Sequence, residues 1–272
     1  MNVTKEGLLI TCLQGTNINL YEIQNKKYKN IQTIRPYSLL GDFIALFDYK
    51  YSIQKFVELK NGKLVFLVYQ YGISFYEKKK NSKKYSYLNK FEILEIDQNA
   101  TDLVELEDNQ YYLYFYSGKK IKFLNMNLKK ITNVLNANVY FSSSKNQMIL
   151  MNKNDLLLAG NVNILVIDVQ NKIIAKNIQH IMNGSICTMY KLNDKRILLG
   201  GLGNYIEQIE YDEIKKNIKV ISNNGKKDKI VVNYFPSHVI SSISVFKNNL
   251  IVSPFNNKSD HNSLIIYQLK NI

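Results

Sequence analysis

The sequence predicts an all-β fold, a β-propeller of about six four-stranded blades, on three observations. A short polar turn recurs along the 272 residues, the segments around it have the apolar patterns of β-strands, and the copies lie at nearly regular distances. Hydrophobic residues make up 46% of the chain, which is enough for a buried core and too many for a disordered chain.

The recurring turn consists of Asn, Asp, Gly and Lys residues between two apolar positions. Full copies begin at Leu59, Leu106, Met151 and Leu192. A copy one residue shorter spans 246–250, and residues 5–8 resemble a truncated first copy. These polar residue types tolerate turn and left-handed backbone conformations, so each of the six copies predicts a β-hairpin.

Apolar or small residues precede the turn, six and three positions before its first residue. They are Ile53 and Phe56, Ala100 and Leu103, Ile186 and Met189, and Ile240 and Ile243, with only Met148 before the third copy. A step of three places successive residues on opposite faces of a strand, so both faces are expected to be buried.

After the turn, the pattern predicts a second strand, a short turn that often contains Gly, and a third strand. The third strands are predicted at 72–76, 121–124, 164–168 and 264–267. A more polar fourth strand follows in most copies, for example at 172–176. Each copy is therefore expected to be a four-stranded antiparallel meander.

The spacing of the copies favours a propeller. The residues that leave the turns are 41 to 56 positions apart, close to the roughly 40 to 50 residues of a propeller blade. They are Leu8, Leu64, Tyr111, Leu156, Ile197 and Leu250. Sheets that are apolar on both faces can bury these faces by stacking side by side around a ring. Five or seven blades also fit, and the alternative fold is a β-sandwich or two smaller β-domains, which need no fixed long period.

We expect one propeller domain over residues 1–272, and the sequence leaves two ways in which its ring could close. Residues 1–6 are too few for a full innermost strand, and Ile272 directly follows a third strand. Propellers usually complete one blade from both ends of the chain, which removes an exposed sheet edge. Either the first and last blades share strands, or the ring is incompletely closed.

The N-terminal residues indicate a cytoplasmic protein, and the cysteines do not indicate a metal site. The N-terminal segment lacks the pattern of a secretory signal, and no uninterrupted apolar run reaches the length of a membrane span. Cys12 and Cys187 are far apart and have no second ligand at metal-binding spacing. Both are expected to be small buried hydrophobic residues.

The net charge of +14 comes almost entirely from lysine, because only Arg35 and Arg196 are arginines. A lysine-rich, arginine-poor composition is typical of an AT-rich genome, whereas reading of bases or phosphates favours arginine. The lysine clusters follow third strands or lie beside turns, where lysine also blocks sheet-to-sheet association. They are Lys78–Lys80 with Lys83 and Lys84, Lys119–Lys120, Lys129–Lys130, Lys215–Lys216, and Lys226–Lys227 with Lys229.

The sequence contains no local catalytic, cofactor-binding or metal-binding motif. The three histidines are not at metal-binding spacing, and the segment Gly200–Gly203 lies in a repeat turn without a predicted helix behind it. We therefore predict that the chain is not an enzyme and that it requires no cofactor. A propeller enzyme with a site in its central channel stays an alternative, because such sites are built from residues far apart in sequence.

Two segments carry a resemblance to a known family. Residues 157–168 look like the strand, Gly-containing turn and strand with terminal Asp of WD40-type propellers, and residues 197–204 resemble its first half. His180 and His238 precede innermost strands, as the family's histidine does, and the resemblance implies a structural hydrogen-bonding role for both. The chain has no Trp and no Gly-His pair, so it resembles a degenerate member. His261 lies in a polar segment and is expected to be solvated.

These observations predict a non-catalytic protein-protein interaction scaffold, a subunit or adaptor in a larger assembly. Binding residues are expected on loops that the blades hold in place, and the chain by itself is expected to be a monomer. The alternative is a propeller whose Lys-rich loops bind RNA or an anionic surface.

Overall fold

In the residues that it describes, the computed structural model consists of β-strands and the turns that connect them, with no helix. These are residues 2–4, 6–12, 17–24, 27–34, 53–68, 72–91, 102–106, 112–117, 120–125, 130–137, 148–160, 162–179, 181, 185–202, 205–223, 226–227, 229–231, 239–246, 249–255 and 265–268. The chain divides into two compact units, and the boundary passes through the third sheet. The first unit comprises 1–105, 112–118 and 122–132, and the second comprises 106–111, 119–121 and 133–272.

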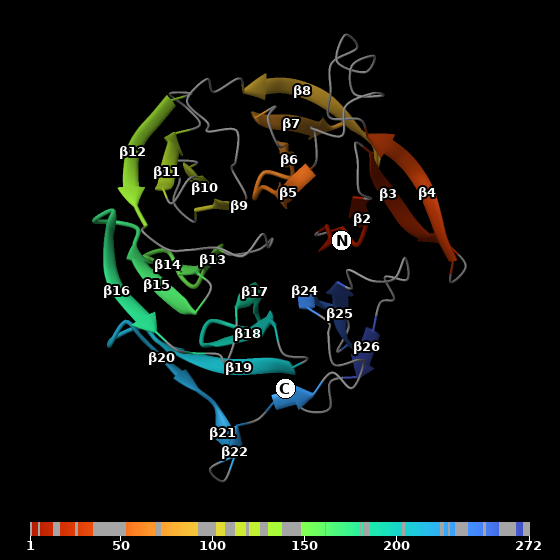
Figure 1. Cartoon of the computed structure of the whole chain (residues 1–272). Coiled ribbons are helices and arrows are strands. Elements are labelled where there is room, and N and C mark those ends of the chain that lie inside the picture. Colours follow the sequence, from red (N-terminus) through yellow and green to blue (C-terminus); the bar gives the residue numbers. More distant parts are fainter. Residues whose placement is uncertain are drawn as a thin grey trace. The chain divides into compact units, whose positions relative to one another are not determined.

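The first unit contains two complete sheets and most of a third, each with its strands in chain order (Figure 1). The first sheet is β1 (Asn2–Val3), β2 (Leu9–Cys12), β3 (Ile18–Gln24) and β4 (Lys27–Ile34). The second is β5 (Ile53–Glu58), β6 (Leu64–Val68), β7 (Gly72–Lys78) and β8 (Tyr85–Phe91). The third is β9 (Asp102–Glu105), β10 (Tyr112–Ser117), β11 (Lys120–Asn125) and β12 (Lys130–Asn136).

The second unit contains the remaining sheets. The fourth sheet is β13 (Met148–Leu150), β14 (Asp155–Ala159), β15 (Asn163–Asp168) and β16 (Ile173–Gln179). The fifth is β17 (Ile186–Lys191), β18 (Arg196–Gly201), β19 (Tyr205–Asp212) and β20 (Asn217–Val220), with β23 (Lys229–Val231) also paired to β19. The sixth is β24 (Val239–Phe246), β25 (Asn249–Phe255) and β26 (Ile265–Gln268). A small hairpin pairs β21 (Ser222–Asn223) with β22 (Lys226–Lys227).

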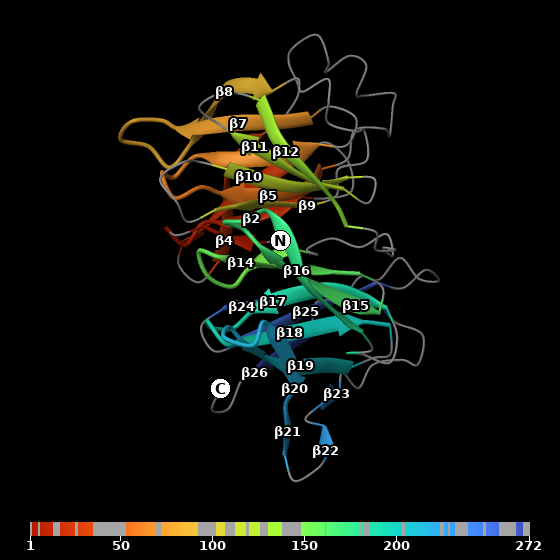
Figure 2. The same ribbon diagram turned by 90° about the vertical axis from the view of Figure 1, so that its left-hand side faces the viewer.

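The predicted four-stranded meander is present in four sheets, and two sheets differ from it. In the fifth, β20 pairs with residues 209–212 of β19, and β23 pairs with residues 205–207. The hairpin of β21 and β22 is inserted between these two short strands and extends beyond β20 (Figure 2). The sixth sheet has three strands in the described residues.

The recurring turn closes in the same way in four copies. The N–H of its first residue donates to the carbonyl oxygen four positions on, from Leu59 to Lys63, Met151 to Asp155, and Leu192 to Arg196. In the first copy the pair is Thr4 and Leu8, at 2.8 Å. The first copy is therefore complete and not truncated as predicted, because its first position is Thr4 and not an apolar residue. The copy at 106–111 lies largely outside the described residues.

Both faces of the inner strands are buried, as predicted. All five residues of β6 and all five of β14 are buried. In contrast, exposed and half-buried residues alternate along β12, an outer strand. Apolar clusters fill the space between neighbouring sheets within each unit, for example Ile10 with Phe66 in the first and Leu157 with Ile197 in the second. Stacking of sheets thus accounts for the step-of-three pattern.

Candidate functional site

The topology gathers two turns of each sheet at one end. Successive hairpins of an antiparallel meander alternate between the two ends of the sheet, so the first and third turns share an end. We call this the hairpin end. In the fourth sheet it carries residues 151–155 and 168–172, and in the fifth it carries 192–196 and 212–217.

An asparagine side chain shapes the first turn in both of these sheets. Asn152 Oδ1 accepts hydrogen bonds from the N–H groups of Asn154 and Asp155, both at 2.8 Å. Asn193 Oδ1 accepts from Lys195 and Arg196 at 3.0 and 2.9 Å. The side chain thereby satisfies backbone donors that a sharp reversal leaves without partners, and this is why Asn is favoured in such turns.

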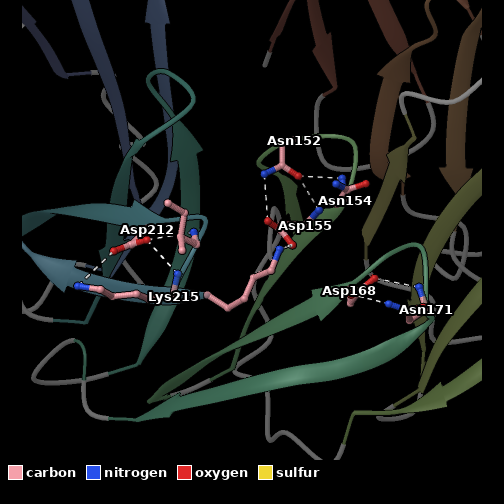
Figure 3. A network of polar contacts seen from close by, with 9 residues as sticks. Asn152, Asn154, Asp155, Asp168, Asn171, Asp212 and Lys215 are labelled. Carbon is pink, nitrogen blue, oxygen red and sulfur yellow. Dashed lines mark hydrogen bonds and ion pairs between the residues drawn. The ribbon is translucent and has the colours of Figure 1, made fainter.

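The two hairpin ends are joined by a buried carboxylate. Asp155 is 0% exposed, Asn152 Nδ2 donates to its Oδ2 at 3.0 Å, and Lys216 Nζ of the fifth sheet forms an ion pair with its Oδ1 (Figure 3). We call these three residues the Asp155 clasp. Burial raises the pKa of the neighbouring Tyr211, and the charge of Asp155 raises it further. A charge without solvent requires such partners, so the clasp fixes the relative position of the two turns.

A second lysine reinforces this junction. Lys191 Nζ donates to the carbonyl oxygen of Met151 at 2.5 Å and forms an ion pair with Asp194 at 2.9 Å. The first turn of the fourth sheet is thus held by two lysines from the fifth.

The third turns of these sheets have the same construction. Asp168 pairs with Ile173 and Asp212 pairs with Asn217, so each turn has four residues, and the last of them is a lysine with positive φ. Asp168 Oδ1 accepts from the Asn171 N–H at 2.9 Å (Figure 3). Asp212 Oδ1 accepts from Ile214 and Lys215, both at 3.0 Å.

Asp168 is held in its charged form. Partial burial raises the pKa of Asp168, but the backbone and side-chain hydrogen bonds from Asn171 and the charge of Lys216 outweigh this effect. The pKa of Asp168 consequently lies below its usual value. The carboxylate is a stable acceptor that keeps the turn in one conformation.

The hairpin end of the first two sheets is basic. Residues 78–84, which we call the basic turn, connect β7 to β8 and contain five lysines. Lys78 forms an ion pair with Glu6, and Lys83 forms one with Glu22. Lys79, Lys80 and Lys84 are exposed and have no ion pair to another described residue. The predicted position of lysine clusters after third strands is confirmed here and at Lys215–Lys216.

The remaining residues singled out in the sequence fall into two groups. Cys187 is buried, as predicted, and Lys120 and Lys130 are exposed. His180, His238, His261, Lys119 and Lys129 lie outside the described residues, as do the side chains of Cys12 and of the lysines at 226–229.

Gly200 and Gly201 have a packing role at the end of β18. A Cβ on Gly201 would lie 1.9 Å from the carbonyl oxygen of Ser185, and a Cβ on Gly200 would lie 2.6 Å from Ile240 Cγ2. Only glycine permits these approaches. The element that follows is strand β19, so the segment does not have the loop-to-helix arrangement of a phosphate-binding loop.

Sequence reasoning did not identify the Asp155 clasp or the inserted hairpin. Asp155 and Lys216 are far apart in the chain, and a single Asp in a polar turn resembles any other turn residue. For the hairpin, a pattern was present. Asn224–Gly225 between β21 and β22 is a preferred two-residue hairpin connection.

Two kinds of feature are absent from the described part of the chain. No group of three or more His, Cys, Asp or Glu side chains there is arranged to hold a metal ion. None of its segments forms a helix that could cross a membrane.

Comparisons with known proteins identify the fold. No family model and no curated protein matches the chain. A protein of unknown function from Bacteroides caccae is similar over 96% of this chain and 89% of its own, with 11% identity and a TM-score of 0.57. The Cps50 (Swd1) beta-propeller domain of Myceliophteria thermophila matches 100% of this chain and 86% of its own, with 12% identity and a TM-score of 0.61. A chain of the mitotic checkpoint complex matches over 99% and 74%, with 9% identity and a TM-score of 0.66.

The described sheets and these likenesses agree with the fold that the repeats predicted. Identities near 10% show the fold and nothing beyond it. The chain is an all-β propeller, similar in structure to WD40-type propellers.

Proposed function

We propose that this chain is a non-catalytic scaffold that binds other proteins, as a subunit or adaptor in a larger assembly. The observation that carries the proposal is the hairpin end of the fourth and fifth sheets. Its four turns are held by Asn and Asp side chains and by the Asp155 clasp, so exposed residues are presented without the cost of ordering a loop.

The similar structures support the same role. One of them is a chain of the mitotic checkpoint complex, which is an assembly of proteins. On this proposal the chain is a cytoplasmic monomer of one domain until it meets its partner, and it requires no cofactor.

Co-purification from the native source tests the proposal. The tagged chain should retain a protein in a stable complex of fixed stoichiometry at about 150 mM salt. Size-exclusion chromatography of the complex, followed by mass spectrometry, identifies the partner. If only nucleic acid is retained, or if the recovered protein dissociates during chromatography, the scaffold proposal is wrong.

A second candidate function has its own observation. The basic turn presents Lys79, Lys80 and Lys84 as exposed cations, while Lys78 and Lys83 attach it to the first sheet. Clustered lysines bind phosphates by releasing counterions, so such binding weakens steeply as salt rises. This arrangement favours RNA or an anionic surface as the ligand.

Charge reversal tests this candidate. Changing Lys79, Lys80 and Lys84 together to Glu should remove binding of single-stranded RNA, measured by fluorescence anisotropy over a salt series. A control with the same change in net charge reverses the exposed Lys120, Lys153 and Lys219. Equal losses in the two variants would mean that overall charge, and not the basic turn, binds RNA.

A further inference from the structure

One large apolar side chain is far more exposed than any other in the described residues. Ile214 in the turn between β19 and β20 is 94% exposed, and the next most exposed is Tyr28 at 57%. Single exposed apolar residues are common on protein surfaces. The question is whether the turn requires an isoleucine at this position.

The neighbouring sheet shows that it does not. The turns 168–173 and 212–217 have the same length, begin with a capping Asp, and have a lysine with positive φ at the same place, φ 55° at Lys172 and φ 48° at Lys216. In this correspondence Ile214 matches Gln170, which is exposed as well. A polar side chain therefore fits this position, and the turn forms without an apolar one.

The turn holds Ile214 in a fixed position. Asp212 accepts hydrogen bonds from the N–H groups of Ile214 and Lys215, and Lys216 is anchored to the buried Asp155. A partner would not have to order this loop on binding. Rigid, exposed apolar side chains of this kind become binding hot spots when a partner buries them.

The charges around Ile214 suggest what surrounds the partner's pocket. Lys215 has an exposed side chain that forms an ion pair with Asp212 at 3.9 Å, and the adjacent turn contributes the exposed Lys195 and Arg196. The two turns touch, because the N–H of Tyr211 donates to the carbonyl oxygen of Lys195 at 2.7 Å. Glu213 is an exposed anion, whereas the exposed Asp194 is paired with Lys191. Among the described residues, the cations without an ion pair here are Lys195 and Arg196, and they exceed the one such anion, Glu213, which favours an acidic rim.

From these observations we propose that Ile214 is the anchor of a docking surface whose partner is a protein with an apolar pocket and an acidic rim. This inference rests on the proposed scaffold function and names its binding residue.

The test uses the whole chain of 272 residues and the matched position. One variant carries a photo-crosslinking residue at position 214, and a second variant carries it at position 170. Each variant is crosslinked in lysate of the native source. The crosslinked protein is identified by mass spectrometry, purified, and titrated against the wild type, Ile214→Gln and Gln170→Ala. Thermal unfolding of each variant shows whether it is folded.

Ile214→Gln should raise the Kd by at least about 10-fold, which is the effect of removing a hot spot, and should leave the Tm unchanged. Gln170→Ala should change neither quantity, and the crosslink should form from position 214 and not from 170. Because the anchor is apolar and the rim is charged, salt should slow association while the loss caused by Ile214→Gln persists at high salt.

Several results would overturn the inference. A partner that binds Ile214→Gln as tightly as the wild type leaves the scaffold function in place and rejects Ile214 as its anchor. Self-association that Ile214→Gln abolishes would identify a second copy as the occupant and reject the acidic partner. If the wild type and the variants retain only nucleic acid, or form no stable complex with any protein, both the scaffold function and this inference are rejected.

Discussion

The hairpin ends of the first two sheets and of the fourth and fifth sheets share the construction of their first turns but are stabilised differently. In the first two sheets, residues 4–8, 24–27, 59–63 and 78–84 contain ten lysines and one acidic residue. In the fourth and fifth sheets, the four corresponding turns contain six cations and five acidic residues. The basic turn is held by exposed ion pairs, whereas the other end is held by the fully buried Asp155.

This difference distinguishes the effect of amino-acid composition from the effect of where the charged residues are placed. The codon bias that the composition predicts accounts for abundant lysine, but it does so equally in both regions. It does not explain why acidic residues lie within the turns of the fourth and fifth sheets, whereas at the other end the partners Glu22 and Glu77 lie in strands β3 and β7. We infer that the fourth and fifth sheets use charge to fix geometry, while the basic turn leaves charge available to solvent or a ligand.

The largest expected effect comes from Lys216→Met. This change leaves the carboxylate of Asp155 buried without its cation, so unfolding should become easier by about 3 kcal/mol, the lower end of the range for such losses, since Asn152 still donates to Asp155. Urea denaturation measures this change in the free energy of unfolding. The control is Lys215→Met, with a side chain 77% exposed, which should change stability by less than about 0.5 kcal/mol. Equal effects of the two changes would show that the clasp does not stabilise the fold.

A smaller difference is expected between Asn152→Ala and Asn61→Ala. Asn152 accepts two backbone hydrogen bonds and donates to a buried carboxylate, and its loss should cost about 1–3 kcal/mol. Asn61 Oδ1 accepts a single hydrogen bond, from Lys63 at 3.1 Å in an exposed turn, and its loss should cost about 1 kcal/mol or less. The midpoints of urea denaturation report both. A larger loss for Asn61→Ala would reverse the comparison.

Lys78→Ala should have a still smaller effect. It removes the pair with Glu6, in which both side chains are partly exposed, so the expected loss is about 0–1 kcal/mol. Salt should reduce this loss further, because it screens exposed charges more than buried ones. The same urea experiment at low and high salt measures both changes. If salt leaves the loss from Lys78→Ala unchanged, or removes that from Lys216→Met, the proposed contrast between the regions fails.

The repeat made most of the fold predictable. Strands at 72–78, 163–168 and 173–179 lie where the pattern placed them, because burial of both faces leaves a strong trace in a sequence. The first turn was misread because Thr4 is polar, although its hydroxyl accepts a hydrogen bond from the Leu8 N–H at 3.0 Å and is buried with it.

The candidate site was much less predictable. The sequence indicated the lysine clusters, but not which lysines are paired, since the partners of Lys78 and Lys83 belong to another sheet. Ile214 was equally hidden, because an isoleucine next to a strand usually faces the core. Only the correspondence with Gln170 distinguishes it, and that correspondence depends on hydrogen-bond register and backbone angles.

The last prediction compares the units at alkaline pH. Burial raises the pKa of Tyr85 in the first unit to about 12, with smaller contributions from Glu58 and Glu6, and burial also raises the pKa of Tyr211 in the second. In the unfolded chain tyrosine loses its proton near pH 10, as its ordinary value of 10.0 implies. The unfolded state therefore binds fewer protons above this pH, and stability should fall as the pH rises from about 10 to about 12.

Replacing each buried tyrosine by phenylalanine isolates its share of this fall. Tyr85→Phe and Tyr211→Phe should each flatten the alkaline decline of the urea midpoint, and Tyr28→Phe, at an exposed position, should not. The two replacements should flatten the decline by similar amounts between about pH 10 and 12, because burial raises the pKa of both tyrosines well above 10. A decline that neither replacement flattens would mean that the burial of these tyrosines does not couple proton loss to unfolding in either unit.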